Sequence, residues 1–235
     1  MEVNEIMAEL KANGSDSIKK ILLKHGVKEP FFGVKVEYLK TIQKKVKTNY
    51  QLAKDLYATG NADAMYLAGL IADDEKMTKD ELQTWVKQAV SNNIAEYTVP
   101  WVTTGSHYGF ELANEWINNK DERIAASGWS TLSNLVSLKP DDELDLKALK
   151  GLLTRVEQTI HSSQNRVRSA MNIFVISLGT YVAALTDDAI AAANKIGDVT
   201  VDKNGTACKV PKAVEYIQKA LGKGKPVAKK KTVKC

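Results

Sequence analysis

The chain has 235 residues, of which 44% are hydrophobic and 26% charged, a balance typical of a globular domain or one continuous repeat array. No apolar run approaches the length of a membrane span, and the first residues lack the apolar core of a signal sequence. The two cysteines, Cys208 and Cys235, provide neither a disulfide framework nor a metal-ligand cluster. We therefore expect a cytoplasmic protein.

The net charge of +5 is concentrated at one end of the chain. Residues 222–235 carry six lysines and no acidic residue, so the remaining residues hold 27 basic against 28 acidic side chains. The body of the protein is therefore close to neutral, and only local basic patches can argue for a nucleic-acid partner.

Helical periodicity dominates from the first residues onward. Val3, Ile6, Met7 and Leu10 share one face of a predicted helix over 2–11, and a second helix follows from Ser15 or Asp16 to about 25. After a loop over 26–34, the spacing of apolar residues predicts further helices, and no convincing strand alternation is present. They are placed at 36–46, 50–59, 61–72, 78–91, 94–103, 108–118, 121–137, 144–159, 164–179, 181–195 and 211–221.

One helical pattern recurs along this array. Residues 120–129 and 165–174 each begin with a polar capping cluster, followed by an arginine and, two positions later, an alanine: Arg123 and Ala125 align with Arg168 and Ala170. A weaker copy occupies residues 61–71. Repeated helix pairs stack because none can bury its apolar face alone, which predicts an α-α superhelix of HEAT-like repeats with a concave face.

This interpretation gives one solenoid domain over residues 1–221, followed by a disordered lysine-rich tail over 222–235. Within the domain, Asn204-Gly205 predicts the turn of a short hairpin-like excursion. The tail is expected either to bind polyanions without specificity or simply to aid solubility.

Basic residues are unevenly distributed. Residues 18–54 contain ten lysines against Glu29 and Glu37, whereas all four arginines, at 123, 155, 166 and 168, lie between residues 123 and 168. The planar guanidinium binds phosphate in a fork that lysine cannot match, so this restriction indicates a geometric requirement. Contacts to phosphate and bonds between neighbouring repeats are equally consistent with it.

Several pieces, taken in order, resemble the AlkD-like DNA alkylation-repair family, which is built from HEAT-like repeats. They comprise residues 32–39, 67–73, 121–126, 165–168 with 172–176, and 207–211 with Ala213 and Tyr216-Ile217. The later pieces are similar to a divergent bacterial branch. The resemblance implies that alkylated duplex DNA lies on the concave face, and that cationic purine adducts are excised without drawing the base into a deep pocket. It also implies that Arg123 grips the DNA backbone.

The family's Trp-Asp-x-x-Asp motif has no match in this chain. Residues 95–101 place Glu96 at the tryptophan, Tyr97 at the first aspartate and Pro100 at the catalytic aspartate. Proline cannot supply the carboxylate that stabilises a positive sugar. Glu96 is the nearest carboxylate and the only catalytic candidate, although an exposed structural role suits it better.

Other candidate contacts lie near these residues. Tyr97 and Trp101, with His107 and Tyr108 close by, could stack on a base or sugar, with core packing as the alternative. His161 and Asn165 begin a helix in a polar segment suited to phosphate, or simply cap it. The three histidines are scattered, so we expect no metal site and no cofactor.

The leading hypothesis is a monomeric, membrane-free protein that binds double-stranded, alkylated DNA through Arg123, Arg166, Arg168 and the N-terminal lysines. Hydrolysis of N-glycosidic bonds in alkylpurine nucleotides follows only if a carboxylate replaces the missing aspartate. The alternatives are a non-catalytic binder of damaged, bent or branched DNA, and a HEAT scaffold for protein partners.

Overall fold

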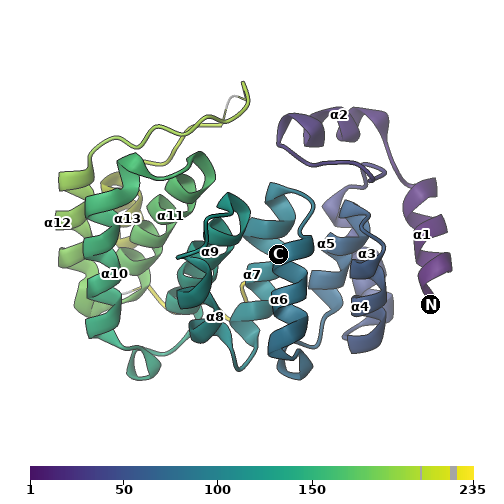
Figure 1. Ribbon diagram of the computed structural model, residues 1–235, viewed down its shortest axis with the longest axis horizontal. Coiled ribbons are helices and arrows are strands. Elements are labelled where there is room, and N and C mark those ends of the chain that lie inside the picture. The colour runs from purple at the N-terminus through teal and green to yellow at the C-terminus, as the bar shows by residue number, and fades with distance from the viewer. Residues whose placement is uncertain (207, 223–226) are drawn as a thin grey trace. The chain divides into compact units, whose positions relative to one another are not determined.

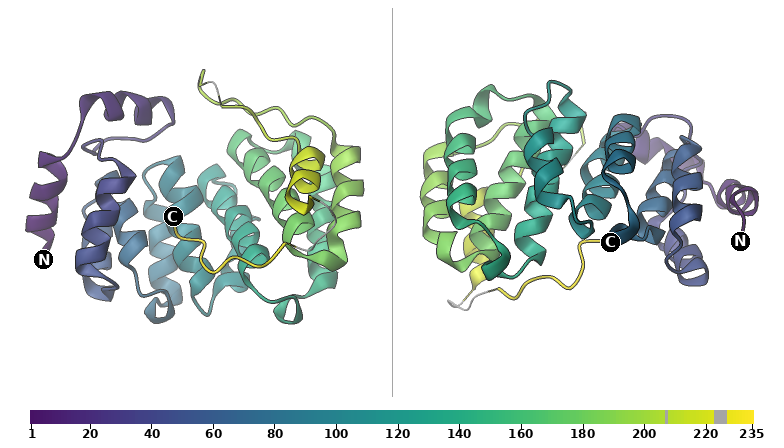
Figure 2. Two further views of the ribbon diagram at one scale, coloured as in Figure 1. Left: turned by 180° about the vertical axis from the view of Figure 1, so that it is seen from behind. Right: turned by 60° about the horizontal axis from the view of Figure 1, so that its bottom comes forward.

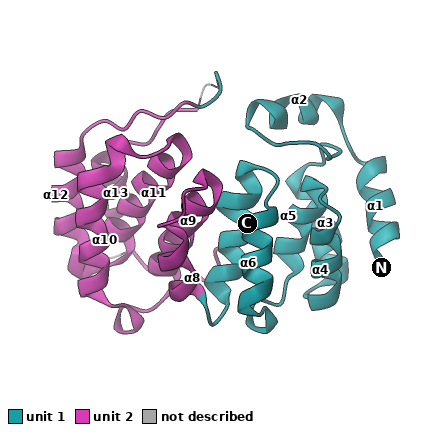
Figure 3. Cartoon of the chain, in the orientation of Figure 1, with its two compact units in different colours: residues 1–108, 203–206, 234–235 teal, residues 109–202, 207–233 magenta. Residues whose placement is uncertain are grey.

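The computed structural model describes residues 1–206, 208–222 and 227–235 (Figure 1). Every regular element in these ranges is a helix, which confirms the predicted all-α class. Two compact units share the chain (Figure 3): Met1–Tyr108 with Lys203–Thr206 and Lys234–Cys235, and Gly109–Asp202 with Ala207–Val233. We call them unit 1 and unit 2. The single domain expected over 1–221 stays a prediction.

Unit 1 is built around the apolar helix α5. Its helices are α1 (Val3–Ala12), α2 (Asp16–Lys24), α3 (Val36–Val46), α4 (Tyr50–Ala58), α5 (Ala62–Ile71), η1 (Asp74–Lys76), α6 (Lys79–Gln88), η2 (Ile94–Thr98) and α7 (Val99–Gly105). Helix α5 contacts α3, α4 and η2, and nine of its ten residues are buried. The exception is the half-buried Tyr66. Contact on several sides explains why this sequence shows no single apolar stripe.

The buried carboxylate of Asp63 fixes the loop that precedes α3. Its oxygens accept backbone N–H groups from Phe32 at 2.6 Å, Gly33 at 3.0 Å and Val34 at 3.2 Å. Burial raises the pKa of Asp63, and these three hydrogen bonds oppose the rise. Gly33 adopts a φ of +79°, a conformation that glycine reaches without strain. One side chain thus positions a loop that has no regular structure of its own.

The helix predicted over residues 94–103 has a different local geometry. The segment Ile94–Thr98 (η2) is a π-helix, and it continues directly into α7. Pro100 lies in the first turn of α7 and has no N–H to donate to the preceding turn. Such wide π-turns are rare and occur mostly as single turns within α-helices.

Unit 2 repeats one helix-packing arrangement. Its helices are α8 (Gly109–Trp116), α9 (Glu122–Leu138), η3 (Asp141–Glu143), α10 (Leu146–Thr159), η4 (Ile160–Ser162), α11 (Asn165–Tyr181), η5 (Ala183–Leu185), α12 (Thr186–Ile196) and α13 (Ala213–Leu221). Helices α9 and α11 form its most extensive contact, and α13 packs on α11 and α12 (Figure 2).

The two copies of the repeated pattern start these central helices. Ala125 and Ala170 are 3% and 4% exposed, as expected of small residues that allow close helix packing. Larger side chains fill the space beyond them, where the rings of Trp129 and Phe174 are 5.3 Å apart and fully buried. Small residues at the start and aromatic residues in the middle therefore set the spacing of α9 and α11.

The lysine-rich tail differs from the disordered segment that its composition predicted. Residues 223–226 lie outside the described part of the chain, but residues 227–235 make defined contacts. In unit 2, Lys229 pairs with Asp141 at 2.7 Å, and the backbone N–H of Lys230 donates to the Ser137 carbonyl at 2.8 Å. In unit 1, Lys234 pairs with Asp74 at 2.7 Å. Composition signals an unstructured segment, whereas distant acidic partners hold this one.

The Asn204-Gly205 turn is present as predicted. Both residues have positive φ, 53° and 70°, and Thr206 N–H donates to the Lys203 carbonyl at 3.1 Å. These features match a type I′ hairpin turn, although no strand flanks it among the described residues.

No single helix in the described ranges is long and apolar enough to cross a membrane; by length and composition alone, the bent pair Asn165–Tyr181 and Ala183–Ile196 meets the same criterion.

The close approach of α8 and α9 at Gly128 predicts a large effect of one added methyl group. A Cβ at Gly128 would lie 2.7 Å from the Ile117 nitrogen and 2.9 Å from the Ala113 carbonyl oxygen, both backbone atoms. We expect Gly128→Ala to destabilise unit 2 by about 1–3 kcal/mol, as overpacking does. Urea unfolding measures the loss.

Gly151→Ala is the matched control, because a Cβ there meets nothing within 4 Å and the residue lies inside α10. It should stabilise by about 0.5–1 kcal/mol. Equal effects of the two substitutions would contradict the packing assigned to Gly128.

The buried Asp74 predicts a specific pH dependence of stability. Burial raises its pKa from the ordinary 3.8 to about 6, although Lys234 opposes the rise. The folded protein therefore binds this proton more tightly, so the contribution of Asp74 is greatest below pH 4 and is lost as the pH rises through 6. The difference corresponds to about 3 kcal/mol.

Urea unfolding between pH 4 and pH 7 should show this loss in the wild type and not in Asp74→Asn. Asp188→Asn, which removes an exposed pair with Lys150, serves as the control. Parallel pH profiles for wild type and Asp74→Asn would show that Asp74 does not titrate in this range.

Candidate nucleic-acid interface

Apart from the half-buried Lys40, the lysines of residues 18–54 fall into two groups. Three are paired with acidic side chains in unit 1: Lys19 with Glu29 (2.8 Å), Lys45 with Glu9 (3.2 Å) and Lys54 with Glu81 (2.6 Å). Six others are exposed and form no ion pair within the described ranges: Lys20, Lys24, Lys28, Lys35, Lys44 and Lys47. The positive charges of these six side chains are available to contact a polyanion.

Helix geometry aligns some of the unpaired lysines. Lys20 and Lys24 are four residues apart on α2, so they share one face of that helix. Lys28 and Lys35 follow in the loop held by Asp63. Unit 1 therefore presents four unpaired positive charges over α2 and the start of α3.

Three aromatic residues of unit 1, Tyr66, Tyr97 and Trp101, form one cluster. Trp101 is 5% exposed and meets the Tyr66 ring edge-on at 5.2 Å and the Tyr97 ring at 6.2 Å. Tyr97, on the π-helix, is 53% exposed. Tyr66 was missed by sequence reasoning; its place in the weakest copy of the repeated pattern was the available signal.

Beside this cluster lies a cavity of about 300 Å³. Tyr66, Tyr97 and Trp101 line it together with Asp63, whereas Glu96 does not. The one acidic side chain among the described residues that line the cavity is therefore committed, since the Asp63 oxygens already accept three backbone N–H groups. Pro100 is buried in α7 and contributes no carboxylate. The catalytic role suggested for Glu96 stays a prediction.

The N-terminal ends of α9 and α11 in unit 2 are joined by polar side chains. Glu122 accepts the backbone N–H of Arg166 at 2.7 Å, and Gln164 donates to the Lys120 carbonyl at 3.3 Å. Asp121 caps α9 and pairs with Arg123 at 3.3 Å. Burial alone would raise the pKa of Asp121, but hydrogen bonds from the Arg123 backbone and guanidinium lower this pKa below its ordinary value. Carboxylates thus already occupy N–H groups that a phosphate could use.

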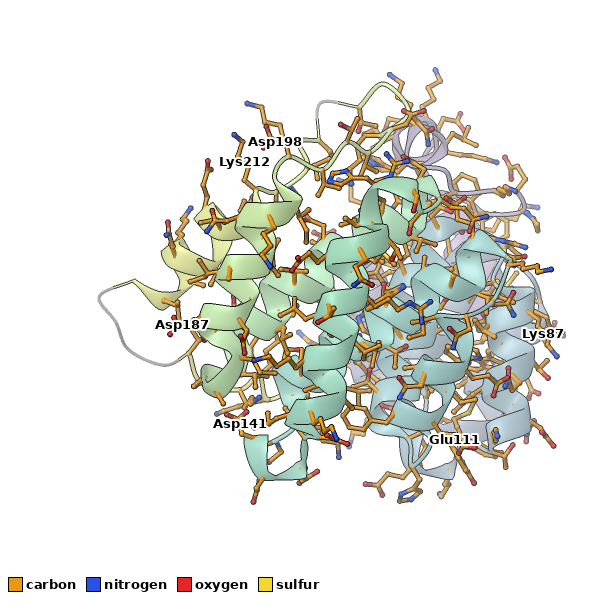
Figure 4. All side chains as sticks on the ribbon, turned by 60° about the vertical axis from the view of Figure 1, so that its left-hand side comes forward. Lys87, Glu111, Asp141, Asp187, Asp198 and Lys212 are labelled. Atoms are coloured by element: carbon orange, nitrogen blue, oxygen red, sulfur yellow. The ribbon has the colours of Figure 1, made fainter. Side chains whose placement is uncertain are left out.

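Three further candidates hold the segment that follows α12. His161 contacts the Ile196 carbonyl at 2.8 Å, and Arg168 donates to the Thr200 carbonyl at 3.0 Å. Asn165 makes two backbone bonds to Asp202, at 3.0 and 2.7 Å, and does not cap α11, where Gln164 is the N-cap. These side chains stabilise residues 196–202. Figure 4 shows Asp198 near Lys212, with which it pairs at 3.5 Å.

Arg155 has a structural role. Its two terminal nitrogens donate to the Ile117 carbonyl and the Asn118 side chain, both at 2.8 Å, and its guanidinium lies over the Trp129 ring. The restriction of arginine to this region therefore reflects, at Arg155 and Arg168, the geometry of bonds to backbone carbonyls. No group of three or more His, Cys, Asp or Glu side chains in the described part could hold a metal ion.

Comparisons with known proteins agree with this architecture. Residues 6–217 match the family described as DNA alkylation repair enzyme. An uncharacterized protein of Listeria innocua is 31% identical over 223 residues, covering 92% of this chain and 96% of the relative. One from Listeria monocytogenes is 30% identical over 228 residues, covering 94% and 98%.

A solved structure aligns along both complete chains with a TM-score of 0.91 and 35% identity. It is described as a new family of proteins related to the HEAT-like repeat DNA glycosylases, with affinity for branched DNA structures. The predicted HEAT-like fold is thereby confirmed, and the chain belongs to the DNA alkylation repair enzyme family.

Proposed function

We propose that this protein binds branched DNA and does not cleave the glycosidic bond. The observation that carries the proposal is Pro100, a buried residue of α7 at the position of the family's catalytic carboxylate. The departing base leaves a positive sugar, and a carboxylate beside it is the usual source of stabilisation. Within the described part of the chain, the cavity lined by Tyr97 and Trp101 has Asp63 as its one acidic side chain, and the oxygens of Asp63 hold the loop before α3.

The unpaired lysines of unit 1 support binding to DNA. Lys20, Lys24, Lys28 and Lys35 are exposed, close in sequence and without acidic partners in the described ranges. Each phosphate that such a side chain neutralises releases counterions, which favours association at low salt. Backbone contacts of this kind position a nucleic acid without reading its sequence.

The preference for branched DNA rests on the solved relative. That protein has affinity for branched DNA structures and is 35% identical over the full length of both chains. The expected monomeric state, the cytoplasmic location and alkylated duplex as a ligand remain expectations. A protein-interaction scaffold is the rival function, favoured by the near-neutral composition outside the tail.

Replacing Lys20, Lys24, Lys28 and Lys35 together by alanine should weaken binding to a three-way junction. If all four contact phosphates, the slope of log K against log salt falls in magnitude by about 3–4, since each contact contributes about 0.9. Fluorescence anisotropy at several salt concentrations measures both quantities.

The charge-matched control replaces Lys11, Lys87, Lys147 and Lys219, which are also exposed. Its slope should equal that of the wild type. Equal slopes for both variants would remove the assigned surface, and absence of any salt-dependent DNA binding would favour the protein scaffold.

The missing carboxylate predicts binding without base release. A three-way junction should bind about tenfold more tightly than a duplex of equal length, a difference of about 1.4 kcal/mol. Methylated DNA incubated with excess protein should release neither 7-methylguanine nor 3-methyladenine, as measured by chromatography of the supernatant. Release by the wild type that is lost in Glu96→Gln would instead establish a relocated catalytic carboxylate.

A further inference from the structure

The cavity of unit 1 has the walls of a binding site for a flat ring. Its volume of about 300 Å³ lies at the lower end of the range of small-molecule pockets. The aliphatic side chains of Leu22, Val27 and Val36 line one part, and the rings of Tyr66, Tyr97 and Trp101 line another. This size suits one ring system and is too small for a lipid chain or a folded peptide.

None of the three rings stacks face to face on another. Tyr66 and Trp101 meet edge-on at an interplanar angle of 83°, and Tyr97 and Trp101 at 50°. Tyr97 remains 53% exposed, although burial of an aromatic ring is favourable. An added planar group in the cavity would cover apolar surface that the folded chain leaves open.

The polar atoms of the cavity are few and mostly committed. Asp63 holds the backbone of residues 32–34, and burial together with a hydrogen bond to Cys235 raises the pKa of the Tyr66 hydroxyl. Asn93 accepts a hydrogen bond from Ser91 at 2.5 Å through its side-chain oxygen. Its amide nitrogen has no acceptor in the described part of the chain, so it can donate to a ring nitrogen or carbonyl of a ligand.

Positive charge lies on the same chain segment as these apolar walls. Along the sequence of α2 and the loop to α3, the unpaired Lys20, Lys24, Lys28 and Lys35 alternate with the cavity-lining residues Leu22, Val27, Val34 and Val36, and in α2 the two lysines lie on the face opposite Leu22. An apolar ring pocket beside several lysines matches the two halves of a nucleotide, a planar base and an anionic phosphate.

From these observations we infer that the cavity binds one unpaired nucleobase of branched DNA, held by the three rings while the neighbouring lysines contact its backbone. This rests on the proposed function and goes beyond the family resemblance, which implies a base that is not drawn into a deep pocket. Branch points suit such a site because a base that is already unpaired costs little to move out of the stack.

The test is a double-mutant cycle on binding affinity, in which one change is made in the DNA and the other in the cavity. A three-way junction carries one unpaired adenine at the branch, or an abasic nucleotide in its place. For the wild type, loss of the base should weaken binding about tenfold, within the range of base–aromatic stacking. For Tyr97→Ala, which removes an exposed wall, and for Val36→Trp, which fills the space, the two junctions should bind alike, within about twofold.

Tyr216→Ala is the control, because Tyr216 is a tyrosine of equal exposure, 54%, on α13 of unit 2. It should retain the full tenfold difference between the two junctions. Thermal unfolding identifies any variant that fails to fold, and Tyr97→Ala alone then completes the cycle.

Two different failures can be told apart. In the first, the abasic junction weakens binding equally for the wild type and the cavity variants, or weakens it for none of them. In either case the protein binds the junction, but the cavity inference is wrong. If no variant and no wild-type protein binds any junction, the proposed function fails and the inference fails with it. Free deoxyadenosine monophosphate, titrated against the wild type, shows whether the cavity takes a nucleotide outside a DNA strand.

Discussion

The carboxylate of Asp63 is the constraint on which the candidate interface depends. It is buried in the first turn of α5 and accepts the N–H groups of residues 32–34, so a loop without regular structure gains a fixed path. That path carries Val34 to the cavity, and Lys35 follows Val34 directly in the chain. Burying a charge is costly unless it is fully hydrogen-bonded, and three donors meet that requirement here.

Because the Asp63 carboxylate is used in hydrogen bonds to the loop, it shapes the cavity and is not available for chemistry there. The family resemblance implies a carboxylate where Pro100 lies, and in this chain the buried carboxylate of Asp63 is used to hold the loop that forms part of the cavity wall. The π-helix before Pro100 keeps Tyr97 and Trp101 at the cavity in spite of the proline. On the proposed function, the shape of this site is kept without a carboxylate at residue 100.

Local patterns in the sequence were sufficient to predict much of the fold. Helical periodicity gave the all-α class, the aligned Ala125 and Ala170 are buried at the start of paired helices, and Asn204-Gly205 forms its turn. The π-helix could not be predicted, because one wide turn hardly changes the apolar pattern. The partners of Arg155 and Arg168 could not be predicted either, because both arginines donate to backbone carbonyls, which every residue carries.

Two lysines of the basic tail form ion pairs with aspartates of the same chain. Lys229 and Lys234 each hold an aspartate at 2.7 Å, so they serve as built-in counterions for Asp141 and Asp74. An incoming polyanion would have to displace those carboxylates before it gained either charge. Removing these two lysines would therefore cost little attraction for nucleic acid, and would leave two acidic side chains uncompensated.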